Sequence, residues 1–325
     1  MLRKYAIGAV ALALVVSGCG GKRTPTTPDA NGAQAPCEAS EGRVTIATGN
    51  SGGVYFVLGG GLAKLISDNT KLKASAAETG ASVQNIQQLA DGTYDIAFSL
   101  ADTAADAVNG KGAFEGKPQK VSALSRIYPN YTQVLVRTDS GINSIADMKG
   151  KRISTGSPKS GTEVIAGRLL KTAGLNIDSD VSAQRLDLTK TADGMKDGSI
   201  DGLIWSGGLP TPQITDISTS LKGKVKLIDI TSQLDKMKEI SKVYDTAPIP
   251  AATYGLAETP TIVVPNLLLV KNDFPAGNAC ALTKLIFNKK ADLEKVHPAA
   301  KDITMDKARD SDPVPLHPGA KQALG

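Results

Sequence analysis

Residues 45–66 read TIATGNSGGVYFVLGGGLAKLI, and this stretch decides the fold. The apolar, β-branched run at 43–48 predicts a strand, the glycine-rich segment 49–53 predicts a turn, and the apolar spacing at 54–68 predicts a helix. A strand, a glycine turn and a helix in this order are typical of a parallel α/β unit. The turn matches G-x-S-x-G, the nucleophile elbow of hydrolases, at Ser51. It is equally suited to presenting backbone N–H groups to an anion, so both interpretations stay open at this point.

A second stretch, GSPKSGTE at 156–163, repeats the pattern between a strand at 152–155 and a helix at 162–173. Ser160 or Thr162 can cap that helix, and the same hydroxyls and free N–H groups suit a carboxylate. Ligands of open α/β sheets bind at the carboxyl ends of the strands. Two such openings therefore predict two lobes with a cleft between them, and WSGGLP at 205–210 ends a further strand that leaves room for a ligand.

The remaining pattern alternates short strands and helices, which indicates an α/β fold with two mixed sheets flanked by helices, a central ligand cleft and hinge strands. We expect lobe I to comprise residues 43–136 and 246–325, and lobe II residues 137–245. The hinge strands are expected at 131–137 and 261–270. The other expected elements are strands at 94–99, 121–128, 201–205 and 225–230, helices at 82–91, 101–109, 191–197, 232–240 and 276–296, and an irregular segment at 245–261.

The N-terminus has the features of an exported lipoprotein. Residues 1–18 combine a basic start with an apolar core that is short for a membrane span, and they end in Val-Ser-Gly before Cys19. The resemblance of this junction to a lipobox predicts removal of the signal peptide and lipidation of Cys19, which would tether the protein to the extracytoplasmic (periplasmic) face of a membrane. Residues 19–42 then form a flexible linker.

The two remaining cysteines, Cys37 and Cys280, are an even pair in an exported protein, which favours a disulfide over two free thiols. Such a bond would join the start of the folded region to a late helix.

Composition and motifs exclude several classes of function. With 41% apolar and 21% charged residues the chain is globular, and 4% aromatic residues with dispersed lysines do not form a nucleic-acid-binding surface. The sequence lacks a P-loop, and its two histidines, 20 positions apart, have no metal-ligand spacing. We therefore expect no cofactor, no metal and no nucleic-acid partner.

Catalysis at Ser51 requires a histidine base, for which His297 and His317 are the candidates. Several strands precede the elbow in the α/β-hydrolase pattern, whereas strand 43–48 is the first of this fold. An exported serine hydrolase that uses Ser51 with His317 is therefore the rival hypothesis, and a non-catalytic protein is the main one.

Six stretches together resemble the TAXI-type solute receptors of TRAP transporters. They run in order over nearly all of residues 43–325: ATGNSGGVYFVLGGGLAKLI, ETGASVQNIQQLADGTYDIAFSLADTAADA, LSRIYPNYTQVLVR, SIADMKGKRISTGSPKSGTEVIAGRLLKTAG, GSIDGLIWSGGLPTPQI and LHPGAKQALG.

This resemblance implies a two-lobed, type II-like periplasmic-binding-protein fold, expected to be monomeric, that closes on a small organic acid and delivers it to an ion-driven membrane permease. An importer driven by ATP, of the ABC class, is the alternative partner. The resemblance implies ligand-binding roles for positions from each lobe: Asn50, Gly52, Gly53, Tyr55, Thr79, Ser82, Asn85, Ser99, Asp102, Tyr128, Ser157, Ser160, Gly161, Thr162, Trp205, Gly207 and Pro210.

The sequence departs from the family pattern at two positions. Phe56 stands where tyrosine is usual, and Asn130 stands where glutamate is often found, which removes a negative charge and bears on the cargo. None of the matched positions is an arginine, so the bidentate clamp of many acid receptors is not assigned. The expected ligand is a monocarboxylate, a dicarboxylate or an acidic amino acid such as glutamate, held by hydroxyls, amides and helix N-termini.

Overall fold

The computed structural model describes residues 36–325, and residues Ala35–Gly325 form one compact unit. The expected signal peptide, the lipidation site Cys19 and the linker up to residue 35 lie outside the described residues. No helix in the described part of the chain is long and apolar enough to cross a membrane.

The strands form one mixed sheet in the order β2-β1-β3-β10-β4-β7-β5-β6, with β8 paired to β4 and β9 paired to β10. Their bounds are β1 Gly42–Ala47, β2 Leu72–Ala77, β3 Ile96–Leu100, β4 Val121–Arg137, β5 Arg152–Ser154, β6 Ser182–Gln184, β7 Gly202–Gly207, β8 Val225–Leu227, β9 Asp245–Ile249 and β10 Thr259–Lys271.

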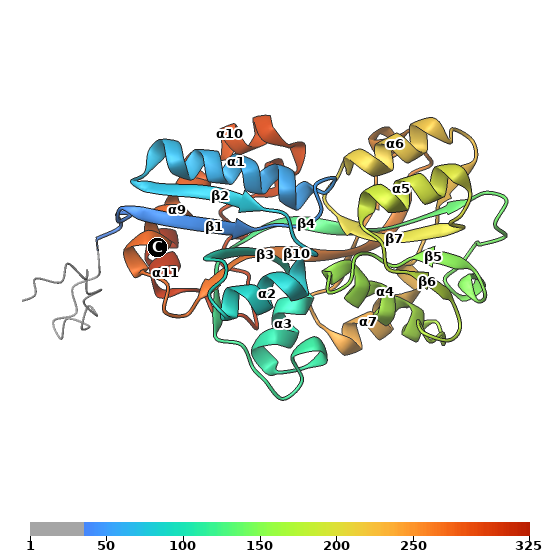
Figure 1. The fold of residues 1–325 in the computed structure, drawn as a ribbon, viewed down its shortest axis with the longest axis horizontal. Helices are drawn as coiled ribbons and strands as arrows, with labels where there is room; N and C mark the ends of the chain where they lie inside the picture. Colours follow the sequence, from blue (N-terminus) through green and yellow to red (C-terminus); the bar gives the residue numbers. More distant parts are fainter. Residues whose placement is uncertain (1–35) are drawn as a thin grey trace, which may run out of the picture. The chain divides into compact units, whose positions relative to one another are not determined.

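Helices cover both faces of this sheet (Figure 1). The α-helices are α1 Val54–Asn69, α2 Ser82–Ala90, α3 Ala101–Asn109, α4 Gly161–Thr172, α5 Leu188–Asp197, α6 Pro212–Ser220, α7 Leu234–Ile240, α8 Ala251–Tyr254, α9 Ala276–Asn288, α10 Lys290–Val296 and α11 Pro318–Leu324. Short 3₁₀ helices are η1 Gly112–Phe114, η2 Ala146–Met148, η3 Thr231–Gln233 and η4 Pro298–Asp302.

The unit has the two expected lobes. Lobe I contains β1–β3 with α1–α3 and α9–α11, and lobe II contains β5–β8 with α4–α7 (Figure 1). Strands β4 and β10 run through both lobes, so the two expected mixed sheets are joined into one. Pro129 and Pro265 face each other where the strands cross between the lobes. The expected lobe boundaries at residues 136 and 245 fall in or beside strands that pair with β4 or β10, and they stay predictions.

The first α/β unit has the expected form. Strand β1 pairs in parallel with β2 and with β3, and α1 begins at Val54, directly after the glycine turn. The equivalent unit of lobe II has β5 between β6 and β7, also in parallel, and α4 begins at Gly161. Both glycine turns therefore lie at the carboxyl edge of a parallel group of strands.

Three expectations about local structure are wrong. The strand expected at 121–128 and the run at 131–137 form the single strand β4, because Pro129 fits an extended backbone without ending it. Residues 245–261 are not irregular: they contain β9 and α8, and β9 carries its proline on a strand outside the main path of the sheet, where the missing donor is tolerated. The helix expected over 276–296 is interrupted at Lys289 and forms α9 and α10.

The Cys37–Cys280 disulfide is confirmed, with sulfur atoms 2.10 Å apart. It joins the segment before β1 to α9 and so closes a loop of 243 positions within the described unit.

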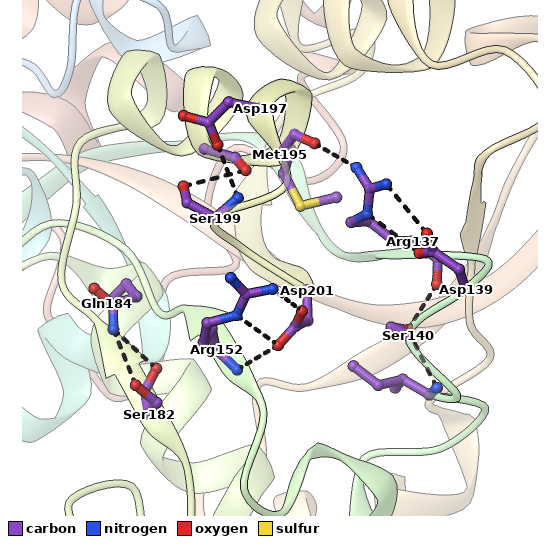
Figure 2. Close-up of polar contacts among 12 residues, drawn as sticks. Arg137, Asp139, Ser140, Arg152, Ser182, Gln184, Met195, Asp197, Ser199 and Asp201 are labelled. Carbon is purple, nitrogen blue, oxygen red and sulfur yellow. Dashed lines mark hydrogen bonds and ion pairs between the residues drawn. The ribbon is translucent and has the colours of Figure 1, made fainter.

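Two arginines make polar contacts within lobe II (Figure 2). Arg152, at the start of β5, pairs with Asp201, just before β7, and Arg137, at the end of β4, donates to the Met195 carbonyl of α5 (3.0 Å) and to Asp139. These guanidinium groups therefore organise the sheet, and they do not reach the cleft between the lobes.

Candidate ligand-binding site

A cavity of about 30 Å³ lies between the lobes, at the carboxyl edges of the parallel strands. Its lining comes from both lobes and from β4: Gly49, Asn50, Gly53, Val54, Tyr55, Gly80, Ala81, Ser82, Leu100, Asn130, Ser160, Gly161, Thr162, Trp205, Ser206, Gly207 and Gly208. This volume suits a few water molecules, since one water needs roughly 10–15 Å³ on the same measure. A larger ligand requires the lobes to separate or side chains to move.

Three helices begin at the cavity: α1 after Gly53, α2 after Ala81 and α4 after Ser160. The N–H groups of a first helical turn have no acceptor within the helix, and the helix dipole makes this end positive. Neither α1 nor α2 has a side-chain cap, whereas the Ser160 hydroxyl accepts a bond from the Glu163 N–H (2.9 Å). The expected helix cap at Ser160 is therefore present, and the first turns of α1 and α2 have no capping side chain, although the Gln84 N–H of α2 bonds the Lys159 carbonyl (3.1 Å).

Two residues of β7 that line this cavity have buried polar atoms without a partner. The Trp205 Nε1 and the Ser206 Oγ are buried and make no hydrogen bond in the described part of the chain. Gly207 lies beside the indole nitrogen, because a Cβ there would be 2.3 Å from it. A buried N–H that has no acceptor is costly, so these groups indicate a site for a ligand that supplies one.

A hydrogen-bonded chain connects the lobes beneath the cavity. The Tyr55 hydroxyl donates to Asn266, which donates to the Asn130 oxygen (2.7 Å), and Asn130 donates to the Ser206 carbonyl (3.2 Å). Burial raises the pKa of Tyr55 well above its ordinary value, so its hydroxyl is neutral at physiological pH. The chain fixes the orientation of the Asn130 amide at the middle of the site.

Other expected ligand residues hold the loops that carry the cavity. Asn85 donates to the carbonyls of Thr48 (2.6 Å) and Phe98 (2.8 Å) and accepts from the Thr79 hydroxyl (2.6 Å). Asn50 donates to the Thr79 carbonyl (3.3 Å). Neither Thr79 nor Asn85 lines the cavity, so the structure places both as positioning residues beneath it.

The remaining expected positions lie outside the cavity lining. Gly52 lies against Gln213 of α6, and the Ser99 hydroxyl donates to the neighbouring Leu100 carbonyl (3.0 Å). Tyr128 is fully buried with an unpartnered hydroxyl, and the Pro210 carbonyl contacts a histidine of lobe I.

Several contacts hold the lobes together around the site. The Ser157 hydroxyl donates to Asn50 (3.0 Å), and the Gln84 N–H donates to the Lys159 carbonyl (3.1 Å). A Cβ at Gly161 would lie 2.5 Å from Leu100 of lobe I. The described conformation is therefore a closed one, with Ser157 in a contact between the lobes.

Asp102 does not line the cavity. Its carboxylate is fully buried and pairs with Arg168 of α4 (2.8 Å), and Tyr244 donates to the same oxygen. Arg168 also pairs with Asp106, so one guanidinium of lobe II is held by two carboxylates of α3. Burial alone would lower the pKa of Arg168, but the two carboxylates and Tyr244 raise it above its ordinary value. This Arg168 cluster (Arg168, Asp102, Asp106 and Tyr244) is an ion-pair network between the lobes.

Within the residues that the structure describes, no hydrogen bond joins Ser51 to either histidine that a hydrolase would need. Ser51 is exposed, and its N–H donates to Glu78 (2.7 Å). The ring of His297 bonds the Pro210 carbonyl (3.1 Å) and the Ala299 N–H (3.1 Å). His317 caps α11 through the Gly319 N–H (3.2 Å). Both imidazoles thus serve as caps at helix N-termini.

Four residues of interest that line the cavity were not predicted from the sequence to bind a ligand. Asn130 stood out only as a departure from the resemblance, and Ser206 and Gly208 stood inside the WSGGLP stretch without a role. Leu100 gave no signal, because an apolar residue at a strand end is usual. Among residues 36–325, no group of three or more acidic, histidine or cysteine side chains is placed to hold a metal ion.

A family model described as the NMT1-like family matches residues 46–324. Two solved structures are similar in fold. A protein from Bordetella bronchiseptica RB50 is 20% identical over 87% of this chain and 88% of its own, with a TM-score of 0.55. A binding protein component of an ABC phosphonate transporter from Pseudomonas aeruginosa is 13% identical over 81% and 80%, with a TM-score of 0.54. These likenesses confirm the two-lobed α/β fold of the periplasmic-binding-protein kind.

Proposed function

Because the chain belongs to the NMT1-like family, we propose that it is an extracytoplasmic solute-binding receptor that captures a small organic acid between its lobes and delivers it to a membrane transporter. One observation carries this proposal: the Trp205 N–H and the Ser206 hydroxyl are buried without partners in a cavity where three helices begin. Such a set of neutral donors and positive helix ends is complementary to a carboxylate.

The closed arrangement supports a receptor that works by lobe closure. Contacts such as Ser157 to Asn50 exist only when the lobes approach each other, and the cavity is too small for a larger acid to enter without opening. A ligand that bridges both lobes favours the closed form by its differential affinity for it. The transporter would then recognise the face that closure creates.

Two transporter classes are candidates for the partner. The similar protein from Pseudomonas aeruginosa is a component of an ABC phosphonate transporter. This likeness supports the ABC alternative better than the TRAP partner expected from the sequence. The TRAP candidate is supported by the sequence resemblance, including the two glycine loops. Uptake of a radiolabelled ligand by cells separates them: an ABC importer fails when ATP is depleted with the ion gradients maintained, and a TRAP transporter fails when an ionophore collapses those gradients.

The proposed location follows from the expected lipobox. Lipidation of Cys19 would anchor the receptor to the membrane outside the cytoplasm. Metabolic labelling with radioactive palmitate tests this directly, because the unmodified protein should incorporate the label and Cys19→Ala should not. Equal labelling of the variant, or no labelling of the unmodified protein, would contradict lipidation of Cys19.

The binding proposal is tested with purified, refolded protein in a thermal-shift screen against carboxylic acids, amino acids, sugars and amines. At about 100 times its dissociation constant, a true ligand adds about 2.7 kcal/mol of stability, or roughly 5 °C for a chain of this size. A response confined to carboxylates supports the receptor. A response to sugars or amines alone contradicts it.

Trp205→Phe tests the site itself, since it keeps an aromatic six-membered ring and removes the N–H together with the rest of the five-membered ring. Loss of one hydrogen bond to a charged group is worth about 1.5–3 kcal/mol, so the dissociation constant for the acid should rise roughly 10- to 100-fold. In the ligand-free protein no hydrogen bond is lost, because this N–H has no partner there, so any fall in stability should reflect only the packing of the smaller ring. Unchanged affinity in the variant would remove the indole from the site.

A further inference from the structure

None of the residues that line the cavity in the described part of the chain carries a charge at neutral pH: the set contains no Asp, Glu, Lys, Arg or His. The polar side chains are hydroxyls, amides and the Trp205 indole. A charged ligand therefore meets no side-chain counter-ion, and the helix ends set the sign of the local field. Helix N-termini favour an anion and disfavour an ammonium group.

The carboxylates near the cavity are already engaged. Asp102 is held by Arg168 and Tyr244. Glu163 accepts from the Lys159 N–H (2.8 Å) and from Arg185 (2.7 Å). Neither carboxylate lines the cavity.

Glu78 is exposed, accepts from the Ser51 N–H (2.7 Å) and does not line the cavity. An ammonium group in the closed site would thus lose its water without gaining a carboxylate. Burying an unpaired charge costs several kcal/mol. The site therefore penalises the amino group of an amino acid while it favours the carboxylate.

A carboxylate at the position of Asn130 would change this preference for a carboxylate over an ammonium group. Asn130 lies on β4 between the lobes, is only 3% exposed, and lines the cavity beside Ser206. Its amide oxygen is used by Asn266 (2.7 Å) and its nitrogen by the Ser206 carbonyl (3.2 Å). The amide is thus neutral and fixed, and its oxygen already accepts one hydrogen bond and carries no charge to pair with an ammonium group.

We infer that the cavity selects carboxylic acids without an amino group over the corresponding amino acids, and that Asn130 is the residue that sets this selectivity. The inference rests on the proposed function, and it narrows the ligand class to unsubstituted, hydroxy or oxo acids. Glutamate and other amino acids are then excluded by the uncharged lining, and their hydroxy analogues are accepted.

Titration calorimetry with three matched pairs tests the inference: L-lactate with L-alanine, L-malate with L-aspartate, and L-2-hydroxyglutarate with L-glutamate. Each pair differs by a hydroxyl in place of an ammonium group. We expect at least one hydroxy acid to bind, and its amino counterpart to bind at least about 100-fold more weakly, as the cost of an unpaired buried charge requires. An amino acid that binds within tenfold of its hydroxy analogue overturns the selectivity and leaves the receptor function standing.

Failure of all six compounds has a different meaning, because it overturns the expected binding of hydroxy acids. The thermal-shift screen against carboxylic acids decides separately whether the receptor function stands.

Asn130→Asp tests the role of the residue. The variant keeps the oxygen that accepts from Asn266 and adds a negative charge. It should therefore weaken binding of the hydroxy acid and shift the ratio of the two dissociation constants at least tenfold in favour of the amino acid. An unchanged ratio removes the role of Asn130.

Asn272→Asp is the matched control, since Asn272 is exposed, lies outside the cavity and accepts from the Ser122 hydroxyl (2.7 Å) through the same atom. Its binding ratio should equal that of the unmodified protein. Asn130→Ser, which is neutral, should keep the preference for the hydroxy acid even where Asn130→Asp does not fold. Loss of that preference in Asn130→Ser would contradict an argument based on charge.

Discussion

Replacing Arg168 by methionine is expected to open the lobes and to lower the free energy of unfolding. Methionine has a similar length and no charge, so the variant removes the guanidinium and keeps most of the apolar stem. Asp102, which is fully buried, and Asp106, which is mostly buried, then lose the cation that holds them. The expected loss of stability comes mainly from the buried carboxylates that are left without a cation, and less from the lost attraction between the paired charges.

Breaking a buried ion pair by removing one partner costs about 3–5 kcal/mol. Opening of the lobes relieves this cost, because it returns the carboxylates of α3 to water. A change of about 3 kcal/mol corresponds to roughly 100-fold in the equilibrium between closed and open forms, and to the same factor in the affinity for a ligand that binds only the closed form.

Small-angle X-ray scattering and urea unfolding measure the two consequences. The radius of gyration of Arg168→Met should exceed that of the unmodified protein, and the free energy of unfolding should be lower. Arg185→Met is the matched control, because Arg185 pairs with Glu163 and Asp178 on the surface of lobe II alone. Exposed pairs contribute about 0–1 kcal/mol, so the control should change little.

The pH dependence supplies an internal check. Burial raises the pKa of Asp106, and the charge of Arg168 opposes that shift. Without Arg168 the pKa of Asp106 should rise further. A carboxyl whose pKa is raised in the folded state destabilises the folded state at pH values above that pKa, where it is ionised. This destabilisation disappears as the pH falls through the raised pKa and the carboxyl takes up a proton. The deficit of Arg168→Met should therefore be largest near pH 7 and shrink in acid. A variant with unchanged compactness and a stability within 1 kcal/mol of the unmodified protein would refute the reasoning.

Three further predictions concern closure, pH and the disulfide. Gly161→Ala should weaken ligand binding at least tenfold, because its methyl would lie 2.5 Å from a leucine side chain of lobe I, whereas Gly167→Ala on the same helix has open space and should bind normally in calorimetry. Burial lowers the pKa of His297, so the unfolded chain is protonated first and stability should fall as the pH drops below about 6.5; urea midpoints at pH 7 and 5 should differ less for His297→Asn. Reducing the Cys37–Cys280 disulfide should lower the free energy of unfolding by at most about 5 kcal/mol, measured with and without a phosphine reductant, and an unchanged midpoint would contradict it.

Periodicity predicted the elements that are long or bounded by glycine. Helix α1 and strand β1 follow from the alternation of apolar residues and the turn at 49–53, and α4 follows from the second turn. Strand β2, Leu72–Ala77, was not predicted, because its lysine and serine sit among alanines and give no β-branched run. Its pairing with β1 is decided by the fold rather than by its own propensity.

The candidate site was predictable where backbone geometry determines it, and not where the position of side chains does. Gly53, Ser160 and Thr162 line the cavity because a turn before a helix must lie at the sheet edge. Asp102 has an equally suitable place, at the start of α3 after a strand, yet it faces Arg168. That partner is 66 positions away in the other lobe, so only the packing of the two lobes reveals it.

The glycines of both turns have a role that the anion-cradle hypothesis did not include. Gly53 has an ordinary φ of −105°, and Gly52 and Gly161 are not among the positive-φ residues, so none of them is required for backbone conformation. Instead Gly52 and Gly161 lie against the other lobe, since a Cβ at Gly52 would overlap Gln213 and one at Gly161 would lie 2.5 Å from Leu100. A Cβ at Gly53 would make only an ordinary contact with the Trp205 ring (3.4 Å). Glycine in these turns therefore permits close approach of the lobes, and the same small residues that expose N–H groups to a ligand also allow the cavity to close over it. Because both functions use one set of positions, a side chain added there should weaken binding even when it leaves every N–H group in place.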